Sequence, residues 1–304
     1  MRGIFGETLL KIGGRRDDLV VLTADVAKPT NILKFAEAYP DRFFNVGISE
    51  QDMVGIASGL SLSGKVPLMA VFAPFLMRAW EQIRSTVARS NLNVKMVGTH
   101  AGLSGADDGT THQSLEDVAV MRVLPNMAVI VPGDKKEVAE ATEAMIEHTG
   151  PAYMRIGRDD ELSFLSGDPV FKLGRASVVK DGSDVTVFSN GLITSEALTA
   201  ANKSKASVRV IHVPTVKPID KEAIVKAARE TGAVICAEEH SVIGGLGGAV
   251  AEVLSGEYPV RIIRMGINDT FGESGPYKSL LDKYGLTSRH IEEAIEKSVR
   301  GKDH

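Results

Sequence analysis

The sequence places an acidic residue, Glu50, where an apolar run ends and a helical pattern begins. The run FFNVGI (43–48) is short, apolar and rich in aromatic and branched residues, which predicts a buried strand. Ser49 is a favourable helix N-cap, so Glu50 falls in the first turn of the helix that follows. Ligands of α/β folds bind at the carboxyl ends of strands, where this carboxyl group could share a proton with one. Because acids in a first helical turn also complement the helix dipole, position alone leaves a functional and a structural role open.

A second group of reactive side chains lies in the Gly-rich loop THAGLSGADDGTTHQSLED (99–117), which follows another expected strand. The loop gathers His100, Asp107, Asp108 and His112 in a short stretch. Loops at this edge of a sheet can aim polar side chains at a ligand without disturbing the core. The histidines lack H-x-x-x-H spacing, so the pattern favours recognition of a polar ligand over a metal site. A plain surface loop is the alternative.

Aromatic and cationic residues follow two further expected strands. Phe72 and Phe75 flank Pro74, and they suit either core packing or an apolar slot for a planar heteroaromatic ring. Arg155 and Arg158 follow the run AYM, and arginine binds phosphate through its planar fork of paired donors. Lone arginines also form surface ion pairs of little energetic weight, so both readings stay open.

Two smaller candidates lie after the first expected strand. Asp25 ends that strand, and Thr30 precedes a helical pattern. Thr30 could cap the helix or contact an anion at its N-terminus.

The elements that must position these residues are strand-like runs alternating with helix-like runs. This alternation predicts doubly wound, mainly parallel sheets, and the near-continuous apolarity of several strands fits burial on both faces. A stretch rich in Gly, Ser and Asp interrupts the series. The sequence therefore predicts an α/β fold of two doubly wound domains, 1–165 and 184–304, joined by a linker at 166–183.

Composition narrows the class of protein. The 304 residues are 43% hydrophobic and 24% charged, with a net charge of −4, which is typical of a globular protein and gives no reason to expect nucleic acid or an anionic membrane as partner. No apolar run approaches the roughly 20 residues that span a bilayer, and the N-terminus lacks the apolar core of a signal peptide. The single cysteine, Cys236, is expected to be an inert core residue. Together these features predict a cytoplasmic protein.

Two motifs resemble those of transketolases. The string G-I-S-E-Q-D-M-V-G-I-A-S-G-L resembles the glutamate motif of their pyrimidine-binding domain, and T-H-A-G-L-S-G-A-D-D-G-T-T-H-Q resembles their segment from T-H-D to D-G-P-T-H-Q. The resemblance implies that Glu50 binds N1′ of the aminopyrimidine of thiamine diphosphate during transfer of a two-carbon ketol unit between phosphorylated sugars. It implies that His100 and His112 contact substrate hydroxyls as catalytic residues and that Asp108 binds the acceptor's C2 hydroxyl. Thr110 replaces the family's usual proline, which removes no functional group.

The resemblance assigns further contacts along the chain. The segment VFAPFLMRAWEQIR resembles the aromatic pocket for the aminopyrimidine, which makes Phe72 and Phe75 cofactor-binding residues, with Asp25 nearby. Arg158 matches the arginine that binds the sugar phosphate, and Thr30 matches a hydroxyl residue that contacts the same phosphate. The C-terminal part, including EEHSVIGGLGGAVAEVL, resembles a domain that supports dimerisation and shape.

One motif of thiamine diphosphate enzymes is missing. They hold the Mg²⁺-diphosphate with G-D-G followed by asparagine, and G-D-G does not occur in this sequence. The resemblance covers this chain but only the second half of a complete transketolase. It therefore implies a split enzyme, in which a separate N-terminal subunit carries the Mg²⁺ ligands and assembles with this chain as a heterotetramer.

Three alternatives stay open. The 1-deoxyxylulose-5-phosphate synthases have a similar glutamate motif, but typically follow T-H with another histidine where this chain has Gln113. The beta subunits of 2-oxoacid dehydrogenases also lack G-D-G, but their loops lack the T-H-x8-D-G-x-T-H-Q layout. A non-catalytic binding protein of the same fold is the third possibility, since fold alone does not establish activity.

Overall fold

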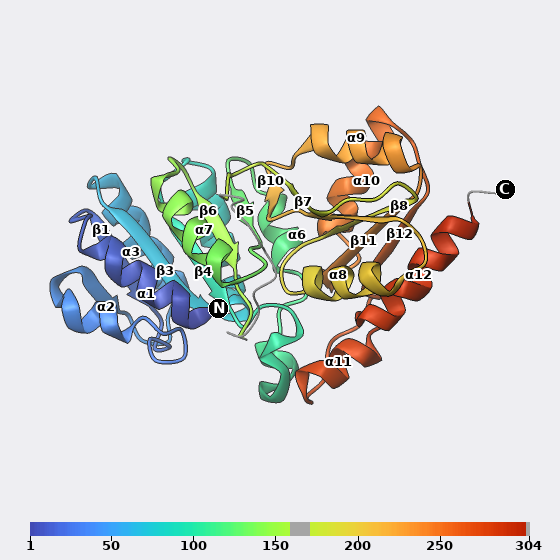
Figure 1. Cartoon of the computed structure of the whole chain (residues 1–304). Helices are drawn as coiled ribbons and strands as arrows, with labels where there is room; N and C mark the ends of the chain where they lie inside the picture. The colour runs from blue at the N-terminus through green and yellow to red at the C-terminus, as the bar shows by residue number, and fades with distance from the viewer. Residues whose placement is uncertain (159–170, 302–304) are drawn as a thin grey trace.

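The computed structural model describes residues 1–158 and 171–301, and these residues form two β-sheets with helices on their faces (Figure 1). The first sheet has seven strands in the order β10-β5-β6-β4-β3-β1-β2, and its pairings are parallel except that of β10 with β5. Its strands are β1 (Leu19–Thr23), β2 (Phe43–Asn45), β3 (Val66–Phe72), β4 (Lys95–Thr99), β5 (Ala128–Ile130), β6 (Ala152–Arg155) and β10 (Thr215–Lys217).

Helices cover both faces of the first sheet. Successive residues of a strand point to opposite faces, so a strand can contribute to two hydrophobic cores. In β1, Leu19 and Val21 belong to one hydrophobic core, whereas Val20 and Leu22 belong to another. Helices α1, α2 and α7 contribute to the first of these cores, and α3 and α6 contribute to the second. The α-helices of this unit are α1 (Arg2–Gly13), α2 (Leu33–Ala38), α3 (Glu50–Leu62), α4 (Ala73–Leu76), α5 (Trp80–Gln82), α6 (Asp117–Arg122) and α7 (Lys135–Glu147).

The second sheet has five strands in the order β12-β11-β8-β9-β7, and only its edge strand β7 is antiparallel. Helices α8 and α12 pack on one face, and α9 and α10 pack on the other. The strands are β7 (Ser177–Lys180), β8 (Val185–Ser189), β9 (Val208–His212), β11 (Val234–Ser241) and β12 (Ile262–Ile267). The helices are α8 (Ile193–Lys203), α9 (Lys221–Thr231), α10 (Leu246–Glu257), α11 (Tyr277–Lys283) and α12 (Ser288–Arg300).

The two units are joined by more than the chain that links them. Strand β10 comes after β9 in the sequence but completes the first sheet beside β5. The buried side chains of Glu137 on α7 and His212 at the end of β9 also meet, with 2.7 Å between Glu137 Oε2 and His212 Nε2. Figure 1 shows the two sheets side by side with β10 between them.

The predicted fold class of two mainly parallel α/β units is confirmed. The prediction of a buried strand at 43–48 is wrong: β2 ends at Asn45 and its side chains are half-buried or exposed, because it is an edge strand that pairs only with β1. Strand β7 lies inside the range expected as a linker. The expected domain end at residue 165 lies outside the described residues.

Two other expectations concern single features. Cys236 is 1% exposed in the second unit, and burial raises the pKa of its thiol, as expected for an inert core residue. Across the described ranges, no helix combines the length and apolarity that a membrane span requires.

Candidate active site

Loops that follow parallel strands bring the candidate residues to one edge of the first sheet. Asp25 follows β1, Glu50 follows β2, Phe72 ends β3, His100 follows β4 and Arg158 follows β6. These strands are neighbours in the sheet and run in the same direction, so their carboxyl ends lie along one edge. Residues far apart in the sequence are therefore presented on the same side of the molecule.

Glu50 is the first residue of α3 and is only 3% exposed. Ser49 precedes the helix as expected, but its hydroxyl donates to the carbonyl of Val46 (2.8 Å) and does not cap the helix. One carboxylate oxygen of Glu50 lies 3.3 Å from Nη1 of Arg78, a side chain that is 60% exposed. A buried carboxylate thus has a largely exposed cation beside it, and Arg78 is a partner that the sequence did not reveal.

Four rings form a continuous aromatic wall. Phe72 and Phe75 stack with centroids 5.1 Å apart, His100 packs on Phe72 at 3.8 Å, and His112 meets Phe75 edge-on at 5.2 Å. A third ring between the two phenylalanines would need a separation of about 7 Å, twice the carbon contact distance. A planar ligand ring therefore has a face to stack against, but no slot between Phe72 and Phe75.

The imidazole of His100 is held neutral in a single tautomer. Burial, and then the charges of Arg2, Arg158 and His112, lower the pKa of His100 to about 3. Its Nε2 lies 3.3 Å from Nη1 of Arg2, and a guanidinium can only donate, so Nε2 is the acceptor. Nδ1 therefore carries the proton and donates to the hydroxyl of Thr99 (2.9 Å).

Arg2 is a site residue that the sequence did not reveal. Its guanidinium donates to the carbonyls of Pro29 (2.6 Å) and Arg158 (3.3 Å) besides facing His100. Burial and the neighbouring Arg158 lower its pKa, because both disfavour a second positive charge in this place. Two guanidinium groups beside a buried imidazole give this place a positive charge suited to an anion.

Arg158 and Asp108 lie together at the open side of the site. Nη1 of Arg158 is 3.3 Å from Oδ2 of Asp108, and both side chains are partly exposed. The backbone N–H of Arg158 donates to the hydroxyl of Ser104 (3.1 Å), which ties its loop to the loop after β4. A ligand that binds here meets an acid and a base that are already paired with each other.

Thr30 and Asp25 occupy positions that differ from the simplest expectation. Thr30 is fully buried, its hydroxyl donates to the carbonyl of Val26 (2.7 Å), and it caps no helix because α2 begins at Leu33. Asp25 is exposed in the left-handed region (φ 60°), and its N–H donates to Oδ1 of Asn45 (2.9 Å). The Thr30 hydroxyl is hydrogen-bonded within its own turn and is not exposed to a ligand. The Asp25 carboxylate accepts from Nδ2 of Asn45 (3.3 Å) and is exposed.

Arg155 is buried below the site and holds protein groups. Its Nε lies 3.2 Å from Oδ2 of Asp117, and its Nη2 donates to the carbonyls of Ser114 (3.4 Å) and Glu239 (3.2 Å). These partners come from both units, so Arg155 joins the units. Its guanidinium binds protein atoms and is not directed at a ligand.

The carboxyl group of Glu239 lies at the same junction and is 8% exposed. Oε1 accepts from the backbone N–H of Leu103 (2.6 Å), and Oε2 accepts from the hydroxyl of Tyr277 (2.7 Å). Burial raises the pKa of Glu239 from 4.5 to about 7, although these donors and Arg155 oppose the rise.

This raised pKa predicts a pH-dependent stability. Between about pH 4.5 and about pH 7 the folded chain keeps the Glu239 proton that the unfolded chain has lost, so the stability contributed by this group falls as pH rises through that window. The free energy of unfolding of the wild type, minus that of Glu239→Gln, is expected to decrease by up to about 3 kcal/mol. Urea denaturation of both proteins across the window measures it, and a difference that stays flat or grows with pH contradicts the assignment.

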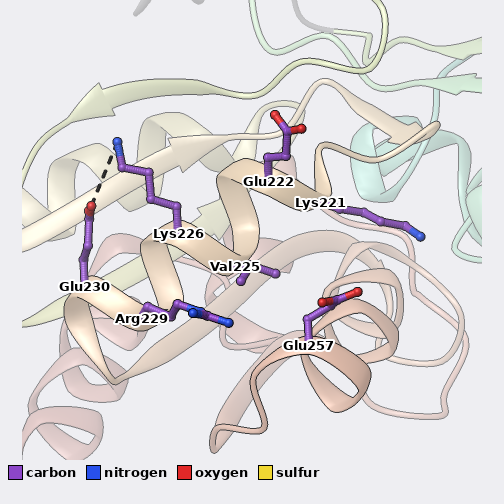
Figure 2. A pocket seen from close by; sticks show the side chains of 7 residues that line it. All are labelled: Lys221, Glu222, Val225, Lys226, Arg229, Glu230 and Glu257. Carbon is purple, nitrogen blue, oxygen red and sulfur yellow. Dashed lines mark ion pairs between the residues drawn. The ribbon is translucent and has the colours of Figure 1, made fainter.

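A separate groove lies away from these residues, on the outer side of the second unit. It has a volume of about 620 Å³ and is lined by α9 and the end of α10. Figure 2 shows its charged side chains, among which Lys226 faces Glu230 at 4.0 Å. Acids and bases alternate along it, and none of the candidate residues lines it. Within the described parts of the chain, no group of three or more His, Cys, Asp or Glu side chains is placed to hold a metal ion.

Two family models match most of the sequence. Residues 1–160 match the model described as transketolase, pyrimidine binding domain, and residues 174–291 match the model described as transketolase, C-terminal domain.

Curated proteins with similar sequences include both separate chains and parts of longer ones. A putative transketolase C-terminal section from Methanocaldococcus jannaschii is 41% identical over 99% of this chain and 96% of its own length. The 6-deoxy-6-sulfo-D-fructose transketolase subunit SqwH from Clostridium sp. (strain MSTE9) is 38% identical over 100% of this chain and 95% of its own length. The 1-deoxy-D-xylulose-5-phosphate synthase of Syntrophotalea carbinolica is 37% identical, and the chain spans 48% of it.

Among solved structures, a split-gene transketolase in the form of an inactive beta4 tetramer superposes with a TM-score of 0.91 and 46% sequence identity. The superposition covers 98% of both chains.

Proposed function

Because this chain belongs to the transketolase family, we propose that it is one subunit of a split, two-component transketolase that moves a two-carbon ketol unit from a ketose phosphate to an aldose phosphate. The observation that carries the proposal is the grouping of a buried carboxylate, a four-ring wall and two arginines at one edge of the first sheet. These groups can share a proton, stack against a planar ring and bind an anion. Ketol transfer between phosphorylated sugars on a heteroaromatic cofactor requires all three.

Thiamine diphosphate fits part of this donor set. In this proposal Glu50 binds the aminopyrimidine nitrogen, which its burial at the start of α3 supports, and the half-buried Phe75 contacts the ring. When bound, the cofactor supplies a nucleophilic carbon that breaks and forms carbon–carbon bonds. The sequence contains no G-D-G motif, so we assign the diphosphate and its Mg²⁺ to a separate N-terminal subunit.

The residues of this chain then perform acid–base and binding roles. Glu50 holds or shares a proton at N1′ of the aminopyrimidine through the carboxylate oxygen that does not face Arg78. His112 binds a substrate oxygen on which charge develops, and His100, whose Nε2 is an acceptor, accepts a hydrogen bond from a substrate hydroxyl. Arg158, with Arg2 behind it, binds the distal phosphate, and Asp108 binds an acceptor hydroxyl.

The oligomer is proposed on the same basis. The similar split-gene transketolase is an inactive tetramer of beta chains, which supports the idea that chains of this kind need a second component. We therefore expect a heterotetramer of this chain with the N-terminal subunit, and no ketol transfer by this chain alone.

Reconstitution tests the proposal. The chain is mixed with the product of a neighbouring reading frame that carries G-D-G, together with thiamine diphosphate, Mg²⁺, a ketose phosphate and an aldose phosphate. We expect two-carbon transfer in the mixture and none with either chain alone. Transfer by this chain without a partner contradicts the split architecture, and no transfer by the mixture favours a non-catalytic protein.

A second candidate function is favoured by the 37% identity to a 1-deoxy-D-xylulose-5-phosphate synthase. The name of that relative gives its product, 1-deoxy-D-xylulose 5-phosphate, which ketol transfer between sugars does not form. Analysis of the products of the reconstituted mixture for this compound separates the two functions, and its formation supports the synthase.

A further inference from the structure

The loop that carries Asp108 and His112 is closed at its base by backbone pairing. The N–H of Gly102 donates to the carbonyl of Ser114 (2.9 Å), and the N–H of Ser114 donates back to Gly102 (3.3 Å). Between these residues the chain makes two short 3-10 turns, η4 (Leu103–Asp108) and η5 (Thr110–His112). The directions of the two functional side chains therefore depend on how this base is anchored.

The anchor is a carboxylate of the second unit. Glu239 accepts from the N–H of Leu103, the first residue after the base, at 2.6 Å. The approach is so close that a Cβ on Gly102, whose φ is +64°, would lie 2.5 Å from Oε1 of Glu239. Leu103 is fully buried, so removing Glu239 takes away the acceptor of a buried N–H.

Other groups orient Glu239 itself. Tyr277 on α11 donates to its second oxygen at 2.7 Å, and Arg155 donates to its backbone carbonyl at 3.2 Å. The same Arg155 side chain donates to the carbonyl of Ser114 at the other end of the loop base and pairs with the buried Asp117. Both ends of the loop are thus connected to Glu239. Leu103 is bound to its side chain directly, and Ser114 is connected to its backbone through Arg155.

Further contacts extend this support along the loop. The side-chain amide of Gln113 donates to the carbonyl of Glu273 (2.8 Å), and the N–H of Ser241 donates to the carbonyl of Leu115 (2.7 Å). Both partners belong to the second unit. The loop is therefore supported by the second unit on the side away from its own sheet.

We propose that Glu239 is a positioning residue, which holds the loop 102–114 so that Asp108 and His112 face the substrate. The functional part of this inference rests on the proposed ketol transfer. It gives the second unit a part in placing the substrate-binding side chains of the first, through one buried carboxyl group.

The neighbouring residue offers a matched control. Glu238 is in the same strand and is also buried, but its side chain points to the other face of the sheet. Its two oxygens accept from the N–H groups of Leu246 (2.6 Å) and Gly247 (2.8 Å) at the start of α10. Losing Glu238 removes a similar pair of hydrogen bonds without touching the loop.

The first test needs only the full chain. Hydrogen–deuterium exchange is measured for the peptide that contains residues 102–114. Glu239→Ala is expected to speed exchange there by about 10- to 100-fold, the cost of one buried unpaired N–H, whereas Glu238→Ala leaves this peptide unchanged. Glu239→Gln keeps an acceptor oxygen and is expected to restore most of the protection. Unchanged exchange in Glu239→Ala, or an equal increase in Glu238→Ala, overturns the proposal.

The second test uses the reconstituted enzyme. Glu239→Ala is expected to raise the KM of the acceptor sugar about tenfold, the scale of one lost hydrogen bond, and Glu239→Gln is expected to lie close to the wild type. If Glu239→Ala does not fold, Tyr277→Phe removes one donor to the same carboxylate, and the absence of any change in exchange or KM then overturns the proposal. If no ketol transfer is found but the exchange pattern is as expected, the proposed function fails and the anchoring role of Glu239 stands.

Discussion

Replacing Glu50 with alanine is expected to lower kcat for ketol transfer by about 10³-fold in the reconstituted enzyme, the usual scale of a lost proton-transfer group. Its carboxylate is buried at the start of α3, at the same edge of the first sheet as the other candidate residues. The fold is expected to survive, because the partner left behind, Arg78, is 60% exposed and can be solvated. Steady-state rates at saturating cofactor and substrates measure the effect, and thermal unfolding checks the fold.

The first turn of α3 supplies a control for this prediction. Asp52 is also acidic but is exposed. Asp52→Ala changes the charge of the same helical turn by the same amount, so it is expected to keep nearly full turnover. If Glu50→Ala turns over as fast as Asp52→Ala, the assignment of Glu50 as the proton-sharing group is wrong.

Replacing Arg158 with alanine is expected to raise the KM of phosphorylated sugars by about 10- to 100-fold, which corresponds to the loss of one or two charge-assisted hydrogen bonds. Arg158 is 41% exposed and stands at the open side of the site next to Asp108. Since the proposed contact is to the distal phosphate and not to the reacting carbon, kcat is expected to change much less. Kinetics with matched phosphorylated and unphosphorylated sugars separate phosphate binding from general damage.

Arg175 is a suitable comparison for Arg158. It is an exposed arginine in the second unit that is paired with Glu222 at 3.4 Å. Arg175→Ala removes the same charge from the surface and is expected to leave both classes of sugar unaffected. An equal loss for phosphorylated and unphosphorylated sugars in Arg158→Ala counts against a phosphate contact.

Much of the fold could be predicted because the strands of parallel sheets are buried on both faces. Their apolar runs, as in β1 and β3, stand out from the helical patterns between them. The position of Glu50 at the start of α3 follows from the same change of pattern. Strand β10 escapes prediction because three residues carry no readable periodicity, and β2 misleads because its apolar residues lie at an exposed edge.

The site was less predictable where it depends on long-range contacts. His100, Asp108 and His112 lie in one loop, so their proximity could be read from the sequence. Arg2 makes its contacts with Pro29, His100 and Arg158, which are 27, 98 and 156 residues away. Only the folded sheet, which sets the loops after β4 and β6 beside the start of α1, brings these groups together. No local pattern marks Arg2 as different from any other first-turn arginine.

The placement of β10 has a consequence for how the gene can be divided. A polypeptide that stopped between the two units would leave one edge of β5 unpaired, because only the pairing with β6 would remain, and an open edge of this kind can recruit strands from other molecules. Ribosomal synthesis must likewise pass Lys217 before the first sheet can be completed. We therefore expect truncation of the chain at the boundary between the units to yield aggregates, which would favour keeping both units on one polypeptide.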